Sequence, residues 1–497
     1  MPRFRYCKKC VIVVVLVGIA SQLFVIYRNH NKHAKQTIRR VPLVPQKSAT
    51  VLKTAKQTTL RPRPPEVPIM LWWDSVYTSV DDFRQCGQIT CRVTNNRTLQ
   101  NHMDTRMFIF YGSHFKPYGL PFPRKQNHLW ALLHEESPRN AYILSHEPTL
   151  TYFNFTSSYN QRSDYPIATQ WLQCPDWLQD KEFLLPLVDK NRLRKSGLAP
   201  ILYLQSDCDV PSDRDTFVEL LKKYIPVDSY GACGHNKDMP KRLRFENSMA
   251  PLDEREFFQF AARYKFTLAM ENYVCEDYVT EKLWRPFRLG SVPIVFGAPN
   301  VKEYLPSNKS AILVEDFEDI KDLAEYVKLL DKNNILYNDY LRFKEQPTSN
   351  TKLKKLLKDR DWVPDYCKRK HRSPFQRLKQ TQKQEGLTHS SLFIGFECFL
   401  CNQIHKIEKQ VYSDEIGMQF DSHVATSDQY YCPSPRMFDE NGHYSVHDEK
   451  WSSEWTFGKY EAMALKKLYD AQTTSSEREF SNLALTMLDE EAHGDDY

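Results

Sequence analysis

The chain has 497 residues, which exceeds one ordinary domain and suffices for two α/β domains with appendages. Hydrophobic residues make up 41% and aromatic residues 13%, so wholesale disorder is excluded. The net charge is +6, but residues 1–67 alone carry 14 Lys and Arg against one acid, which leaves the remainder with a net charge of −7. A mildly acidic folded part gives no indication of a surface for nucleic acid.

An apolar run close to the N-terminus predicts a membrane anchor. Val11–Tyr27 holds 17 residues without a charge, just enough for a helix to cross a thin bilayer. A cleaved signal peptide is the alternative, but no small-residue cleavage site follows the run. We therefore expect a cytoplasmic tail at 1–10, a transmembrane signal-anchor at 11–27 and, because residues 28–67 are basic and nearly free of aromatics, an extended stem.

Three N-glycosylation sequons all follow the predicted anchor, at Asn96, Asn154 and Asn308. They favour a single-pass type II membrane protein with its bulk in the lumen of the Golgi or the endoplasmic reticulum. The basic residues on the two sides of the anchor do not settle its orientation.

The cysteines point to the same oxidising compartment. Ten of the 12 lie beyond the anchor, and the pairs Cys86/Cys91 and Cys398/Cys401 are spaced for local disulfides. A zinc site at Cys398 and Cys401 is the alternative, with His405 and Cys367 as candidate further ligands, although no second CxxC or HxxxH motif appears. We favour disulfides.

Short apolar runs separated by polar and helical stretches recur from Pro68 onward, a pattern typical of parallel sheets with crossover helices. They predict strands at Ile69–Trp73, Met107–Tyr111, Leu129–Leu133, Ile201–Leu204, Phe266–Met270, Val292–Phe296 and Ala311–Val314. Two such series predict an α/β chain with two Rossmann-like domains facing across a cleft, at 68–196 and 197–369. The polar segment Lys190–Gly197 marks their boundary.

Two further segments complete the division of the chain. Glu318–Asn333 predicts an amphipathic helix whose apolar stripe is core: Ile320, Leu323, Val327 and Leu330. Residues 370–497 form a Cys-containing C-terminal extension for which the sequence indicates no role.

The most informative stretch is Phe266–Pro306. A buried strand ends in Glu271 and Asn272, and Thr280 can cap a helix that begins with Glu281 and Lys282. Such a strand end, at the carboxyl edge of a parallel sheet, is where α/β proteins bind ligands, and a helix N-terminus with a lysine suits a diphosphate. Glu281 is suited to vicinal ribose hydroxyls. The plainer alternative is that Glu281 pairs with Arg285 four residues on and solvates the helix.

This stretch resembles the signature of the α-1,3-fucosyltransferase family, glycosyltransferase family 10: FTLAMEN, then Tyr278, TEKLW and SVPIVFGAP. A wider resemblance covers 68–366, and the branch of animal fucosyltransferases ten and eleven is the most similar. The resemblance implies a GT-B fold of two Rossmann-like domains. It also implies that Asn272 and Tyr278 bind the donor phosphates or sugar, Glu281 the ribose, and Lys282 and Arg214 the diphosphate.

The opposing domain needs a base, and Leu132–Arg139 ends a predicted strand with a cluster of candidates. Its Glu136-Ser-Pro resembles the family's Glu-Ser-Pro motif, which implies Glu136 as the catalytic base. Glu135, His146 and Glu147 are rivals on chemistry alone, because partial burial can tune any of them.

Asp207-Cys-Asp209 follows a predicted strand and is the type of motif that holds Mn²⁺ on nucleotide sugars in another glycosyltransferase fold. Because Arg214 and Lys282 already offer cations for a diphosphate, we expect no required metal or other cofactor, with Mn²⁺ at most a stimulant. Cys208 is expected to be buried or disulfide-bonded.

The resemblance implies an inverting transfer of L-fucose from GDP-β-L-fucose to an acceptor hydroxyl. The most similar branch favours Ser or Thr of small disulfide-bonded domains of secretory proteins; the alternative is the 3-hydroxyl of GlcNAc in glycans. A non-catalytic luminal protein that binds glycoproteins and an enzyme with another donor, such as GDP-mannose, also remain open. The expected partners are therefore GDP-fucose and a glycoprotein or protein-domain acceptor.

Overall fold

The computed structural model describes residues 67–75, 77, 79–243, 255–362, 367, 391–413 and 423–494. All of them belong to the unit Arg63–Tyr497. The expected tail, anchor and stem, residues 1–66, lie outside the described part. Among the helices of the described part, none combines the length and the apolar character needed to cross a membrane.

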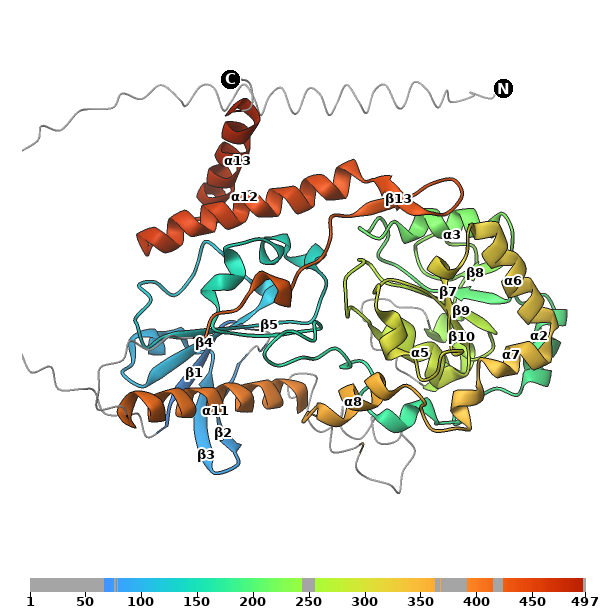
Figure 1. The fold of residues 1–497 in the computed structure, drawn as a ribbon, viewed down its shortest axis with the longest axis horizontal. Helices are drawn as coiled ribbons and strands as arrows, with labels where there is room; N and C mark the ends of the chain where they lie inside the picture. Colours follow the sequence, from blue (N-terminus) through green and yellow to red (C-terminus); the bar gives the residue numbers. More distant parts are fainter. Residues whose placement is uncertain are drawn as a thin grey trace, which may run out of the picture. The chain divides into compact units, whose positions relative to one another are not determined.

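The first sheet has six strands in the order β2-β3-β1-β4-β5-β6 (Figure 1). Their bounds are β1 Ile69–Asp74, β2 Asp81–Cys86, β3 Ile89–Thr94, β4 Thr105–Tyr111, β5 Leu129–His134 and β6 Phe155–Ser158. All neighbours pair in parallel except β2 and β3, which form an antiparallel hairpin at one edge. The predicted strands β1, β4 and β5 are confirmed, whereas β2, β3 and β6 were not predicted.

The expectation of crossover helices is wrong for this sheet. The connections between β3 and β6 contain only short 3-10 turns: η1 Arg97–Asn101, η2 Gly112–His114, η3 Pro138–Asn140, η4 Tyr142–Ser145 and η5 Thr149–Tyr152. Both faces of the strands are nonetheless apolar, because alternate residues point to opposite sides. In β1, Leu71 and Trp73 lie in one core, and Met70 and Trp72 lie in another. Helices must therefore reach these faces from elsewhere in the chain.

The C-terminal extension supplies them. Helix α11 (Ser391–Ser413) packs on the face with Met70 and Trp72. Helices α12 (Glu449–Ala471) and α13 (Glu477–Gly494) pack on the face with Leu71 and Trp73. Figure 1 shows α11 and α12 on opposite sides of the sheet. The extension is thus part of the core of the first sheet.

The second sheet is fully parallel, with strand order β11-β10-β9-β7-β8. The strands are β7 Ile201–Tyr203, β8 Val227–Ser229, β9 Phe266–Met270, β10 Val292–Phe296 and β11 Ile312–Leu313, and the helices are α2 Leu187–Lys195, α3 Arg214–Lys222, α4 Arg255–Ala261, α5 Glu281–Leu289, α6 Ile320–Lys332, α7 Asn334–Asp339 and α8 Thr351–Asp359. The four predicted strands are confirmed, and so is the amphipathic helix, whose apolar stripe is buried in α6. The segment predicted as a boundary, Lys190–Gly197, is mostly helical and includes a buried lysine, Lys190.

Five disulfides join distant parts of the chain. They are Cys86–Cys398, Cys91–Cys401, Cys174–Cys367, Cys208–Cys233 and Cys275–Cys432. The predicted cysteines are thus disulfide-bonded, but the local pairing was wrong: the first two disulfides join the β2–β3 hairpin to α11. Because positions three apart share one face of a helix, Cys398 and Cys401 both meet the hairpin. The four candidate zinc ligands lose three thiolates to these disulfides, which leaves His405.

The three sequons differ in accessibility. Asn96 and Asn308 are exposed. Asn154 is only 3% exposed. Its Oδ1 accepts hydrogen bonds from Trp130 N and from Arg124, and its Nδ2 donates to His423 O at 2.9 Å. The nitrogen of Asn154 that would carry a glycan is therefore buried and hydrogen-bonded, whereas Asn96 and Asn308 are accessible.

Candidate active site

The loop between β9 and α5 is built around a buried carboxylate. Glu271 follows β9, is 4% exposed, and accepts hydrogen bonds from Thr280 N at 2.8 Å and from Thr280 Oγ1. Thr280 in turn caps α5, where its Oγ1 accepts from Lys282 N. Gly297, after β10, allows Glu271 this position, because a Cβ there would lie 2.8 Å from Glu271 Cγ. The predicted cap and the predicted start of the helix are confirmed.

Three charged side chains meet at the N-terminus of α5. Lys282 Nζ lies 3.3 Å from Glu271 Oε2 and 3.4 Å from Glu281 Oε1. Burial opposes the charged form of Lys282, but the two carboxylates outweigh it and raise the pKa of Lys282. Burial likewise opposes ionisation of Glu281, yet Lys282, Arg285 and Thr280 hold its pKa at about 2. The site therefore keeps the cation of Lys282 beside the ionised carboxylate of Glu281.

Arg214 begins α3 and is 1% exposed. Its Nη1 donates to Met270 O at 3.1 Å and its Nη2 to Asp207 O at 2.7 Å. Arg214 is close enough to Lys282 to oppose its charge. Within the described part of the chain, Arg214 Nε and Asn272 Oδ1 are buried without a hydrogen-bond partner. A buried donor and a buried acceptor left unpaired next to a cation pair are expected of a site that binds a polar ligand.

Glu136 reaches this loop from the first sheet. It lies just beyond β5, and Tyr278 Oη donates to Glu136 Oε2 at 3.4 Å. Burial raises the pKa of Glu136, and the charge of Lys282 limits the rise. The structure therefore places a carboxylate of the first sheet beside the cations of the second. Of the sequence-predicted residues, it brings together Glu136, Arg214, Asn272, Tyr278, Glu281 and Lys282.

The rival candidates for the base lie elsewhere. Glu135 accepts a hydrogen bond from Tyr111 Oη at 3.0 Å, and burial raises the pKa of Glu135 to about 7. Glu135 and Glu136 diverge because successive side chains at the end of a strand point to opposite sides. His146 is bonded through Nε2 to Trp455 O at 2.6 Å, and Glu147 is exposed.

The acids of the Asp-Cys-Asp motif are engaged with basic side chains. Asp207 pairs with Arg139 and Asp209 with Lys450. Cys208, expected to be buried or disulfide-bonded, is joined to Cys233. Where the structure describes side chains, two groups have metal-ligand spacing, namely Cys91, Cys401 and His405, and Cys208, Asp215 and Cys233. Each contains two sulfurs bonded to one another, so neither offers thiolates to a metal.

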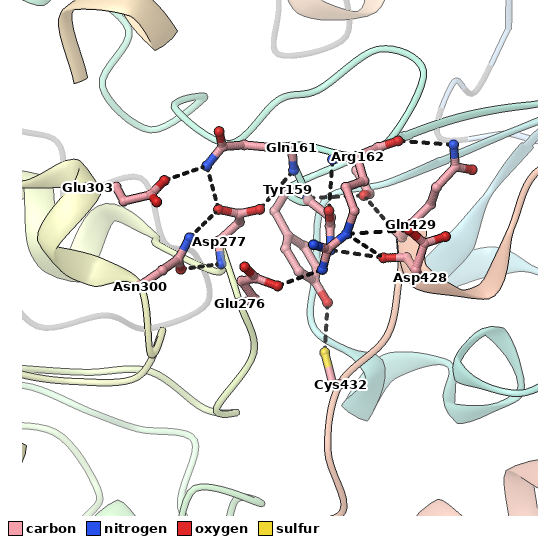
Figure 2. A network of polar contacts seen from close by, with 12 residues as sticks. Tyr159, Gln161, Arg162, Glu276, Asp277, Asn300, Glu303, Asp428, Gln429 and Cys432 are labelled. Atoms are coloured by element: carbon pink, nitrogen blue, oxygen red, sulfur yellow. Dashed lines mark hydrogen bonds and ion pairs between the residues drawn. The ribbon is translucent and has the colours of Figure 1, made fainter. Parts of the chain in front are cut away.

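A network around Asp277 was not predicted from the sequence. Asp277 has a φ of +66° and is buried, and its carboxylate accepts from Gln161 N and Nε2, Asn300 Nδ2 and Tyr304 Oη. Figure 2 shows that Gln161, beyond β6, and Asn300, beyond β10, converge on it. The network joins both sheets directly before Tyr278. A single acid in a polar loop gives no local signal of such a role.

The C-terminal extension also reaches this loop, through Cys275–Cys432 and through Tyr430, whose Oη donates to Glu136 O at 2.7 Å. Neither contact was predicted from the sequence. An even number of cysteines beyond the predicted anchor, one of them inside the motif, was the available signal for the first.

Comparisons with known proteins agree with these features. Residues 194–414 match "Glycosyltransferase family 10 (fucosyltransferase) C-term", and residues 65–170 match "Fucosyltransferase, N-terminal". A GDP-fucose protein O-fucosyltransferase 3 from Xenopus laevis is 40% identical over 440 residues, which are 87% of each chain. Its namesake from Gallus gallus is 37% identical over 492 residues, which are 97% of this chain and 98% of the relative. A crystal structure of an alpha1,3-fucosyltransferase with GDP-fucose has 17% identity, covers 69% of this chain and 96% of its own, and gives a TM-score of 0.36.

Proposed function

Because the chain belongs to the fucosyltransferase family, glycosyltransferase family 10, we propose that it transfers L-fucose from GDP-β-L-fucose to an acceptor hydroxyl with inversion. The single observation that carries this proposal is the 3.4 Å contact of Tyr278 Oη with Glu136 Oε2. It puts a carboxylate of one sheet opposite the cations of the other, as a single displacement requires. We also propose a GT-B layout with domains at 68–196 and 197–369 and an extension at 370–497, a division that the presence of two separate sheets supports.

The donor is assigned to the second sheet. Lys282 and Arg214 hold the diphosphate and stabilise the charge that develops on the leaving GDP, a preorganised arrangement that does not call for a metal. Asn272 Oδ1 and Arg214 Nε, buried without partners among the described residues, support contacts with the donor phosphates or sugar. Glu281, ionised because its pKa is about 2, accepts the ribose hydroxyls.

The chemical step is then one displacement. The acceptor oxygen forms a bond to the anomeric carbon while the bond from that carbon to the β-phosphate oxygen breaks, and the acceptor proton passes to Glu136. A base works best when its pKa approaches the working pH, and burial moves the pKa of Glu136 in that direction. Tyr278 holds the Glu136 carboxylate on the donor side.

We further propose that the acceptor is Ser or Thr of a small disulfide-bonded domain. Relatives that align over most of this chain carry the name GDP-fucose protein O-fucosyltransferase 3, which supports a protein acceptor. The alternatives are GlcNAc in a glycan and a non-catalytic role in binding glycoproteins. The proposed setting is the lumen of the Golgi or endoplasmic reticulum, with an anchor at residues 11–27.

The test is transfer of radiolabelled fucose from GDP-fucose by the purified full-length chain, with and without EDTA. GDP-mannose serves as the competing donor. Two acceptors are compared by mass spectrometry: a small folded disulfide-bonded secretory domain, and a glycopeptide with terminal GlcNAc. We expect fucose on Ser or Thr of the domain, unaffected by EDTA. Transfer only to GlcNAc would refute the acceptor assignment, and no transfer to either would refute the enzyme.

Two matched variants test the base. Glu136→Gln should lower kcat by about 10²-fold to 10⁴-fold, the range for removal of a general base. Glu135→Gln removes the neighbouring carboxylate and should leave kcat within about threefold of wild type. The reverse result would assign the base to Glu135.

A further inference from the structure

The C-terminal extension crosses the candidate active site with residues 423–432, which we name the crossing segment. Its start is fixed to the first sheet, where Ala425 N donates to Phe153 O at 2.9 Å. Its end is fixed to the loop after β9 by the Cys275–Cys432 disulfide. The segment is therefore anchored on both sides of the site.

Buried polar contacts hold the middle of the crossing segment along β6. Gln429 accepts from Thr156 Oγ1 at 3.0 Å and donates to Arg162 O at 3.0 Å, and its own carbonyl accepts from Ser158 Oγ at 3.1 Å. Figure 2 shows Gln429 and Cys432 of the segment beside the residues that follow β6. These contacts hold the main chain directly before Tyr430, and the Cys275–Cys432 disulfide holds it two residues further on.

Tyr430 lies in a chain of hydrogen bonds whose direction is determined. A carbonyl only accepts, so Tyr430 Oη donates its one proton to Glu136 O at 2.7 Å. The 2.5 Å contact of Tyr430 Oη with His134 Nδ1 must then use a proton on His134. The other ring nitrogen, Nε2, accepts from Ser113 Oγ at 3.2 Å. Burial lowers the pKa of His134 to about 3, so the ring stays neutral in this tautomer.

We propose that Tyr430 is a positioning residue for the reaction, supplied by the C-terminal extension. By holding the main chain of Glu136, it fixes the carboxylate that faces Tyr278 on the donor side. The inference rests on the proposed function, since it assumes that Glu136 is the base. The ring of Tyr430 is fully buried and packs against Tyr159 and His134, so its hydroxyl has a defined place. Misplacement of a reacting group by a fraction of an ångström is enough to slow a reaction.

The test compares two buried tyrosines that both contact other segments through their hydroxyls. Tyr430→Phe removes the hydrogen bond to Glu136 O. Tyr273→Phe is the matched control, because Tyr273 Oη donates to Pro433 O at 3.0 Å and anchors the extension just beyond the crossing segment. Steady-state kinetics on the full-length chain give kcat and the KM for GDP-fucose, calorimetry gives the Kd for GDP, and thermal melts give Tm.

We expect Tyr430→Phe to lower kcat by about tenfold while the KM for GDP-fucose and the Kd for GDP stay within about twofold. Both variants lose one buried hydrogen bond and should lower Tm by similar amounts. Tyr273→Phe, however, should leave kcat within about twofold of wild type. An unchanged kcat for Tyr430→Phe, or an equal loss of kcat in both variants, would overturn the inference. Glu136→Gln separates the proposal for the base from the proposal for Tyr430. If Glu136→Gln is fully active, Glu136 is not the base. If Glu136→Gln is inactive while Tyr430→Phe is fully active, only the role of Tyr430 fails.

Discussion

Removal of the cation at Lys282 is the sharpest test of the donor site. Its Nζ lies within 3.4 Å of two carboxylates and 3.0 Å from Thr280 Oγ1, and its side chain is 15% exposed. Lys282→Ala leaves Glu271 and Glu281 without this counter-charge at the proposed diphosphate site. The variant therefore weakens donor binding and the stabilisation of the leaving group together.

The size of the effect follows from the charges. One unit charge about 4 Å from another contributes about 4 kcal/mol at an effective dielectric constant near 20. Only the part that grows as the bond to phosphate breaks changes kcat, and loss of one such group typically lowers kcat by about 10²-fold to 10³-fold. We expect a loss in this range for Lys282→Ala, and a smaller loss for Lys282→Arg, which keeps the charge.

A second readout comes from the pH dependence. The charge of Lys282 lowers the raised pKa of Glu136, so its removal raises that pKa further. The base is active when deprotonated, and its activity falls as the pH falls through its pKa. The acidic limb of the kcat profile should therefore lie above the ordinary glutamate value of about 4.3 in wild type, and should move to still higher pH in Lys282→Ala.

The assay is turnover of radiolabelled GDP-fucose from acid to neutral pH, with GDP binding measured in parallel. Lys302→Ala is the control, because Lys302 is an exposed lysine in the connection that follows β10 and is paired with Asp316. It should leave both readouts unchanged. A kcat for Lys282→Ala within about threefold of wild type, with an unmoved acidic limb, would refute the donor site.

Two further substitutions test the supports of the site and of the fold. Gly297→Ala places a Cβ 2.8 Å from Glu271 Cγ and should raise the KM for GDP-fucose and lower Tm. Gly119→Ala, whose added Cβ would meet no atom closer than 3.9 Å, should change neither quantity. Equal Tm and KM values for the two variants would contradict the packing argument. Glu397→Gln, on α11, breaks a fully buried ion pair with Arg84 and should lower the free energy of unfolding by about 3–5 kcal/mol. The measurement is denaturant unfolding without reductant. An unchanged unfolding midpoint would show that α11 does not need this ion pair.

Much of the second sheet could be predicted because its signals are local. The strand Phe266–Met270, the cap at Thr280 and the helix start at Glu281 are set by residues within a few positions of one another. The first sheet was only half predictable. Its strands are buried on both faces, so their apolar runs were recognisable, but the helices that cover them lie about 300 residues further along the chain.

The sequence by itself determined the α/β class, the family and the identity of the charged residues near the donor loop, because each is written in short contiguous patterns. The tertiary structure decided which of two adjacent carboxylates, Glu135 or Glu136, faces that loop. Adjacent side chains at the end of β5 point to opposite sides, and the placement of β5 in its sheet sets which side faces α5. The tertiary structure also decided the disulfide partners and brought Tyr430 to Glu136. Contacts between residues so far apart depend on how whole helices and strands pack together, which a local sequence pattern does not specify.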